Sequence, residues 1–370
     1  MIGQMKNEEV LLKRRLWLAM IPILIGLACP AFAEDQGGNN KTLYNTPPAT
    51  PPLVTQRPHL DLTLGLGMLK GDTCYQIGGR LTRPNGTSLQ QPDPTSELVF
   101  PLDVTMLSLK ANLGLGERFL IGIGFKKNLS QAAGKMEDSD WGIWYLNPPY
   151  DQYGNLVPTQ HPLRDDSLDI YSESDAELDA LIWDINVGYR FVNKPTWSFT
   201  GTLGLIIQQF NYDVSDPTQW YPSSAYYFGD DLGQYTVSGK VLTYDITYTI
   251  PYLMAEVGGN ITRRIRATAT IGYSPFVWAA DRDHHLYGGS DLDQGSIRTT
   301  DSTGHALMYG LHGWVDLSRQ WTLGAEYEHM DIRTSGDSKT TINGYSGTYS
   351  INEDVKSRQQ YLDLTVTYGF

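Results

Sequence analysis

Cysteine is nearly absent from this sequence. The 370 residues include two cysteines, Cys29 and Cys74, and Cys29 lies in a segment that we expect to be removed. The single remaining thiol excludes an intramolecular disulfide, so other interactions must hold the fold together. The rest of the chain also lacks any run of roughly 18 or more apolar residues, which excludes a membrane-spanning helix there.

Positive charge is scarce as well. The chain has 28 Lys and Arg against 41 Asp and Glu, a formal net charge of −13. The segment expected to be removed carries four of the basic and two of the acidic residues, which leaves 24 against 39 and a net charge of −15. Such a surface repels nucleic acid and attracts cationic partners. We therefore expect cationic peptides or proteins as partners, and no nucleic acid.

The N-terminal region has the pattern of an export signal. Basic residues at 13–15 precede an apolar run at 16–28 and a small-residue site at 31–33. We therefore predict a signal peptide over residues 1–33. Residues 34–58 are rich in Pro, Thr, Asn and Gly and predict a flexible lead-in. The remaining residues, 59–370, form the predicted domain.

Strict alternation of apolar with polar or glycine residues begins near His59. At 181–189 the odd positions are apolar, and 265–273 repeats the pattern. A soluble sandwich would also alternate, so the alternation alone does not decide the fold. The candidate strands lie near 59–79, 98–115, 119–130, 176–192, 196–214, 238–257, 262–280, 303–317, 320–333 and 356–370.

The connections between these strands decide the fold class. Short joins at 116–118, 193–195 and 318–319 alternate with long ones such as 131–175 and 281–302. Short periplasmic turns, long external loops and an even strand count are typical of bacterial outer-membrane barrels. The sequence predicts an all-β fold, a ten-stranded antiparallel transmembrane β-barrel with long extracellular loops. So small a barrel leaves no room for a wide pore, so function should lie on the external side.

Two short motifs fall in these long external loops. DSDW occupies 138–141 and DRDHH occupies 281–285. Each places two ionisable side chains two residues apart, which puts both on one face of an extended strand. Four strands of a ring of ten separate the motifs, so we expect their side chains to converge over the barrel mouth.

This arrangement suits the activation of water. An Asp that pairs with His raises the proton affinity of the imidazole, as a general base requires, and facing carboxylates can hold a water molecule. The alternative is that these residues are ordinary solvated loop positions. HExxH, a calcium-loop pattern and G-x-S-x-G are all absent, so we expect no metal, no other cofactor and no serine nucleophile.

The chain resembles the omptins, a family of outer-membrane proteases with ten-stranded barrels, from about residue 60 to the C-terminus. The matching stretches occur in the order of the family: LGMLKG (66–71), DSDW (138–141), FGDDLG (228–233), IPY (250–252) and WAADRDHH (278–285). The resemblance implies an endopeptidase in the bacterial outer membrane, with its active site on the extracellular side.

The resemblance also implies the roles of the two motifs. In that family an Asp-Asp pair faces an Asp-His pair, which implies Asp138 and Asp140 opposite Asp283 and His285 as the catalytic residues. A water held against the Asp-Asp pair attacks the scissile carbonyl directly, and no acyl-enzyme forms.

Omptins favour basic residues at the cut through two acidic residues at the floor of a pocket. Asp281 matches one of them, and Tyr75 stands at the position of the other. The resemblance implies a substrate-binding role for both positions, with a relaxed preference for Arg or Lys. Tyr75 could contribute a cation–π contact, although an aromatic residue facing lipid or core is the more common arrangement.

Omptins also require lipopolysaccharide as an activator. Residues 208–212 lack the charged groups that bind it in the family, which leaves Lys126, Lys127 and Arg190 as candidates. The loops carry further acidic residues, which either are simply solvated or attract cationic substrates. They are Asp165, Asp166, Asp169, Asp230, Asp231, Asp291 and Asp293.

One geometric expectation follows for the strand that carries DRDHH. If its odd positions face lipid from Ile265 to Tyr273, unbroken alternation would turn Asp283 and His285 outward. We therefore predict a change of phase at Ser274-Pro275, because proline donates no ladder hydrogen bond and favours a bulge. The alternative function, from a different class, is a catalytically silent barrel that acts as an adhesin or receptor.

Overall fold

The computed structural model describes residues 58–151, 153–286, 295–343 and 346–370. The predicted signal peptide and most of the lead-in lie outside this range. No helix of the described part is long and apolar enough to cross a membrane. The strands are β1 (His59–Thr82), β2 (Ser88–Gln90), β3 (Ser96–Pro101), β4 (Val104–Leu115), β5 (Phe119–Asn128), β6 (Ala132–Trp141), β7 (Leu168–Asn193), β8 (Trp197–Trp220), β9 (Gln234–Thr236), β10 (Lys240–Asn260), β11 (Ile265–His285), β12 (Ser296–Asp316), β13 (Trp321–Ile342) and β14 (Tyr349–Gly369), and the short helices are α2 (Ile143–Leu146) and α3 (Ser224–Phe228).

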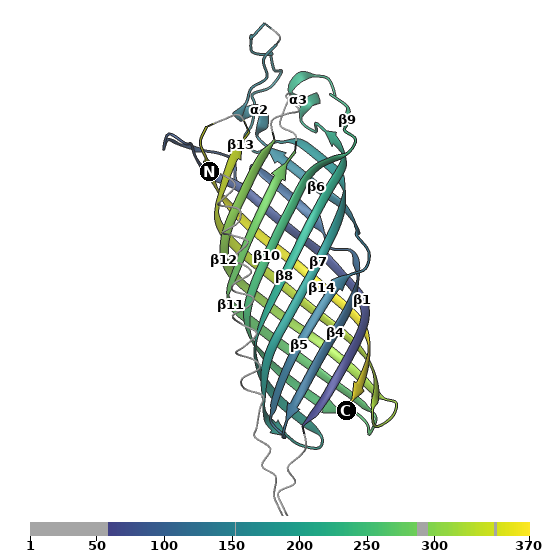
Figure 1. Ribbon diagram of the computed structural model, residues 1–370. Helices are drawn as coiled ribbons and strands as arrows, with labels where there is room; N and C mark the ends of the chain where they lie inside the picture. The colour runs from purple at the N-terminus through teal and green to yellow at the C-terminus, as the bar shows by residue number, and fades with distance from the viewer. Residues whose placement is uncertain (1–57, 152, 287–294, 344–345) are drawn as a thin grey trace, which may run out of the picture. The chain divides into compact units, whose positions relative to one another are not determined.

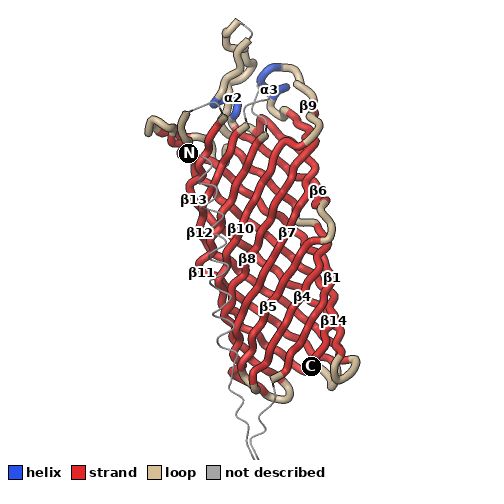
Figure 2. Tube along the Cα trace, in the orientation of Figure 1, coloured by secondary structure: helices blue, strands red, loops and turns tan. Residues whose placement is uncertain are grey.

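Ten strands pair in an antiparallel ring (Figures 1 and 2). The order is β1, β4, β5, β7, β8, β10, β11, β12, β13 and β14, and β14 pairs with β1 to close the ring. The short joins lie at one end of the barrel, at 116–118, 194–196, 261–264 and 317–320, and the long connections lie at the other. The predicted ten-stranded barrel is therefore confirmed.

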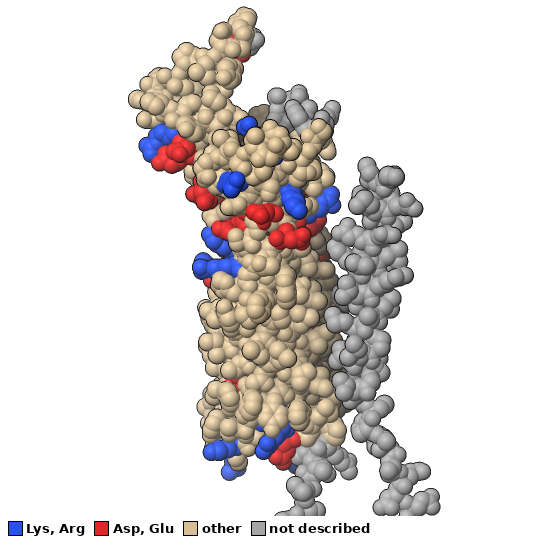
Figure 3. Space-filling view, turned by 90° about the vertical axis from the view of Figure 1, so that its left-hand side faces the viewer, with Lys and Arg blue, Asp and Glu red and all other residues tan. Residues whose placement is uncertain are grey.

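A band of outward-facing apolar side chains surrounds the wall. On β1, for example, Leu62, Leu64 and Leu66 are 43%, 52% and 55% exposed. Above them the outward positions become polar, beginning with Lys70. Figure 3 shows this change on one face, where an uncharged belt separates charged residues near the two ends. Such a band is what a transmembrane barrel presents to lipid.

The strands continue well above this band. After a break near residue 130, β6 extends the line of β5, and β3 extends β4 in the same way, so that β3 pairs with β6 and β6 with β7. The expectation that 131–175 and 281–302 are loops was therefore wrong at their edges. Here the outward positions are mostly polar, and the inner face mixes apolar residues such as Leu98 and Met136 with polar ones such as Asp138. The apolar alternation therefore weakens while the backbone ladder persists.

The predicted change of phase in β11 is confirmed. Pairing with β12 shifts register between Ser274 and Val277. Below the shift Tyr273 faces outward, and above it Phe276 and Trp278 do. The bulge therefore turns the odd positions beyond residue 276 into the barrel.

Aromatic side chains fill the upper half of the lumen. Phe100 stacks on Tyr244 with ring centroids 4.5 Å apart, and Tyr75 and Tyr212 pack against them at 5.3 and 5.0 Å. All four are at most 1% exposed. This aromatic layer gives the polar groups above it a solid floor, in agreement with the expectation that no wide pore exists.

Candidate active site

Two walls of the upper barrel contribute the four predicted catalytic residues. Asp138 and Asp140 lie on the inner face of β6, opposite Leu98 and Ser96 of β3. Asp283 and His285 lie on β11, beyond its bulge. All four stand above the apolar band. They lie on strands, whereas the sequence had placed both motifs in loops.

Asp283 and His285 form a hydrogen-bonded pair. His285 Nε2 lies 2.9 Å from Asp283 Oδ2. Asp283 is 1% exposed, whereas the His285 side chain is 34% exposed and open to the barrel mouth. Burial alone would lower the pKa of His285, but the charge and hydrogen bond of Asp283 outweigh it and raise that pKa. Burial would likewise raise the pKa of Asp283, and His285 and Arg298 lower it below its ordinary value.

Asp138 and Asp140 form the opposing pair. Burial, reinforced by the charge of Asp140, raises the pKa of Asp138 well above its ordinary value. Burial also raises the pKa of Asp140, against a hydrogen bond from Ser96. His285 lowers both pKa values by its charge, so the two pairs lie within electrostatic range across the lumen.

Two buried carboxylate oxygens of these two pairs have no hydrogen-bond partner among the described residues. They are Oδ1 of Asp138 and Oδ1 of Asp283. A buried unpaired carboxylate oxygen is costly, and such groups are usually satisfied by water or ligand. The two walls can therefore hold a polar molecule between them.

Tyr75, on β1, contacts the Asp283–His285 pair. Its side chain is 1% exposed and faces the lumen, and its hydroxyl donates to Asp283 Oδ2. The guanidinium of Arg298, on β12, lies 5.7 Å from the centre of the Tyr75 ring. Tyr75 thus lies in the core, which is the more common arrangement, and Arg298 of the chain itself occupies the ring face that a substrate cation could have contacted.

Asp281 lies one inward position below Asp283 and is 6% exposed. Burial first, and then the charge of Glu353, raise the pKa of Asp281 to about 9. Glu353 comes from β14 and is 1% exposed. A second carboxyl group is therefore present beside Asp281, although it does not come from the position of Tyr75.

The sequence motifs did not reveal Glu353 or Arg298. Both follow the inward alternation of their strands, with Val355 and Thr300 as their next inward neighbours. Charged residues at inward positions of predicted strands were the available signal. The partner strands were not known, so that signal could not be connected to Asp281 and Asp283.

Two of the three candidate contacts for lipopolysaccharide point into the barrel. Lys126 points into the lumen, where its ammonium lies 2.6 Å from Glu328. Arg190 also points inward, since its neighbour Phe191 is 59% exposed on the outer face. Of the three candidates for binding lipopolysaccharide, this leaves Lys127, which faces outward and pairs with Asp179.

Asp169 is not a solvated loop residue. Its side chain is fully buried, and it accepts hydrogen bonds from Ser167 and Ser223, both at 2.6 Å, and from the backbone of Trp144 at 3.0 Å. It therefore ties α2 to the segment before α3. Among the other acidic loop positions, Asp165, Asp166, Asp230 and Asp231 are exposed, and Asp291 and Asp293 lie outside the described residues.

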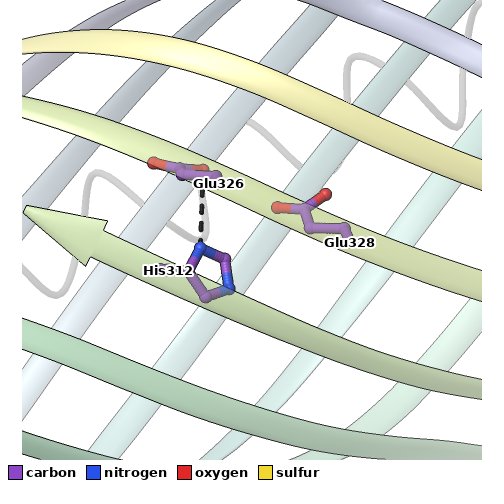
Figure 4. Close-up of side chains that lie close together, drawn as sticks. All are labelled: His312, Glu326 and Glu328. Carbon is purple, nitrogen blue, oxygen red and sulfur yellow. Dashed lines mark ion pairs between the residues drawn. The ribbon is translucent and has the colours of Figure 1, made fainter.

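A second group of ionisable side chains occupies the lower lumen. Ligand atoms of His312, Glu326 and Glu328 lie within 4.8 Å of one another, as a metal site would require (Figure 4). Lys110 forms an ion pair with Glu326, and Lys126 pairs with Glu328 at 2.6 Å. Because ammonium groups already neutralise both carboxylates, this lower cluster suits a metal ion poorly.

The fold and upper site together define a class: a ten-stranded membrane barrel with an Asp-His pair facing an Asp-Asp pair above the lipid band. The model of the Omptin family matches residues 95–370. The chain therefore belongs to the omptin family.

Solved structures agree with this assignment at the level of the fold. The outer membrane protease OmpT from Escherichia coli is 16% identical and has a TM-score of 0.67, with 87% of this chain and 99% of that chain covered. The outer membrane protein OprG from Pseudomonas aeruginosa is 12% identical, with 84% of this chain and 95% of that chain covered. Its TM-score of 0.34 is too low to indicate the same fold. No curated protein matches the sequence.

Proposed function

We propose that this barrel is an endopeptidase of the bacterial outer membrane, with its active site on the extracellular side. The observation that carries the proposal is the pairing of Asp283 with His285 opposite two half-buried carboxyl groups, Asp138 and Asp140. A catalytically silent adhesin or receptor has no need for such facing pairs.

In the proposed reaction His285 acts as the general base. Nε2 is engaged by Asp283, so Nδ1 takes the proton from a water held against Asp138 and Asp140. The resulting hydroxide attacks the scissile carbonyl, and the proton passes to the leaving amine. Asp283 orients the imidazole and stabilises its charged form.

The chain's own thiol does not suit a covalent route. Burial first, with a contribution from Glu97, raises the pKa of Cys74 to about 12. The thiolate, which is the reactive form, is therefore scarce at neutral pH. Direct attack by water remains the proposed chemistry.

We further propose cationic polypeptides as substrates, cleaved at or near basic residues. The exposed acidic residues of the loops favour such substrates by charge. Lipopolysaccharide is proposed as an activator by analogy with the family, with Lys127 as its candidate contact.

The test is cleavage of a fluorogenic peptide containing Arg by the refolded barrel, with and without lipopolysaccharide. Wild-type protein should cleave it, Cys74→Ala should cleave it equally well, and serine-directed reagents should not inhibit. If folded wild-type protein cleaves no peptide under either condition, the silent barrel becomes the better interpretation.

A further inference from the structure

Arg298 is a buried cation within the candidate site to which no role has been assigned. It lies on β12 directly opposite Asp283 of β11 in the strand ladder. The next inward positions of its strand, Thr300 and Ser302, are buried, so the Arg298 side chain also points into the lumen. That side chain is 17% exposed, which leaves part of it in contact with the open mouth.

The surroundings of Arg298 are those of a receptor for a guanidinium group. Nη1 lies 3.8 Å from Asp283 Oδ2 and 3.4 Å from the Tyr75 hydroxyl, and Nε lies 3.3 Å from the hydroxyl of Thr340. Carboxylates and an aromatic ring face are the partners that bind guanidinium groups best.

Two further carboxyl groups lie within electrostatic range of the same guanidinium. They are Glu353 and Asp281, the pair below Asp283. Three acidic side chains thus lie within electrostatic range of one arginine that belongs to the chain itself. A basic side chain of a substrate would have to displace Arg298 or lie beside a like charge, and either arrangement weakens its binding.

Resting on the proposed function, we propose that Arg298 is a specificity-determining residue that occupies the place of a substrate guanidinium. It neutralises the acidic floor from within the protein. The preference for Arg over uncharged residues at the cleaved bond is therefore weaker than the number of carboxyl groups suggests. Removing the guanidinium should strengthen that preference.

The first test needs no catalysis. Agmatine, a small guanidinium compound, is titrated into folded barrels in detergent and its binding is measured by calorimetry. Arg298→Ala should bind agmatine at least about tenfold more tightly than wild type. A tenfold change in affinity is what one charge-assisted hydrogen bond contributes. Arg298→Lys retains a cation and should bind like wild type. Arg282→Ala, an outward-facing control one residue from Asp283, should also be unchanged.

The second test compares kcat/KM for two peptides that differ only in Arg or norleucine before the cleaved bond. The ratio within one variant cancels general effects on the reaction, and it should rise about tenfold or more in Arg298→Ala. Arg298→Met, which retains much of the side-chain volume, replaces the alanine variant if the latter does not fold. An unchanged ratio together with unchanged agmatine binding in a folded variant would overturn the inference. Lack of all cleavage by wild type would overturn the proposed function, and agmatine binding would still decide the role of Arg298.

Discussion

The lumen contains two clusters of histidine and acidic residues that differ in how their charges are matched. In the lower cluster Glu326 and Glu328 each contact a lysine ammonium. In the upper site five carboxyl groups share two cationic side chains, and five buried carboxyl oxygens have no hydrogen-bond partner among the described residues: Oδ1 of Asp138, Oδ2 of Asp281, Oδ1 of Asp283 and both oxygens of Glu353. The five carboxyl groups are those of Asp138, Asp140, Asp281, Asp283 and Glu353, and the cations are His285 and Arg298.

We propose that this difference separates a structural cluster from a functional one. Matched ion pairs inside a barrel satisfy one another. Excess carboxyl groups destabilise one another, since burial and like charge both raise their pKa values. Such an arrangement persists where its chemistry is used, which is why perturbed pKa values are concentrated at functional sites.

The largest expected effect is on catalysis in the upper site. His285→Ala removes the proposed base and should lower kcat by about 10² to 10⁴. His312→Ala, the matched change in the lower cluster, should leave the kcat of folded protein within a few-fold of wild type. Near wild-type turnover by folded His285→Ala would remove the distinction between the two clusters.

The next effect is on stability, and it should appear in the lower cluster. Glu326→Gln leaves the Lys110 ammonium without its closest partner, and breaking a buried ion pair costs up to about 3–5 kcal/mol. The urea midpoint for unfolding in detergent should fall, while kcat of the folded fraction changes little. Asp103→Asn breaks the exposed pair with Lys70 and is the control, with an expected cost below about 1 kcal/mol. Equal midpoints for the two variants would contradict the assignment.

The pH profile should report the unmatched charges of the upper site. The neutral form of His285 is the active base, and Asp283 raises the pKa of this imidazole, so kcat/KM should rise with pH through a midpoint above its ordinary value. Asp283→Asn removes the partner charge and should move the midpoint to lower pH. A midpoint that stays fixed in this variant would show that His285 does not titrate as the base.

The smallest expected effect concerns the acidic rim. If exposed acids such as Asp230 and Asp231 attract cationic peptides, kcat/KM should fall several-fold as salt shortens the Debye length from about 30 Å at 0.01 M to about 10 Å at 0.1 M. An uncharged peptide should show no such dependence. Identical salt profiles for both peptides would mean that these acids are merely solvated.

The sequence predicted the barrel because each membrane-crossing strand alternates over many residues. It also predicted the bulge near Pro275, because the motif beyond it had to face inward. Above the membrane the outward positions are mostly polar and the inner face is mixed, so the alternation is weak and the extended strands there were predicted to be loops. Asp169 illustrates the same limit, since nothing near it in the sequence shows that Ser223 covers it.

The four predicted catalytic residues occur in two short motifs, and the resemblance carried their roles. Glu353 and Arg298 belong to no motif and reach the site from strands that are distant in the sequence from β6. Their participation depends on the order of strands around the ring and on inward alternation within each strand. The spacing of residues in the sequence does not show which strands are neighbours in the ring, so these two residues were missed.

The most direct test of a single site built from two walls is a kinetic double-mutant cycle between Asp138→Asn and His285→Ala, measured as kcat on folded protein. If both residues act on one water, the double variant should be about as slow as the slower single variant, because residues that act as a unit are not additive. Losses that multiply across the two single variants would contradict the shared site.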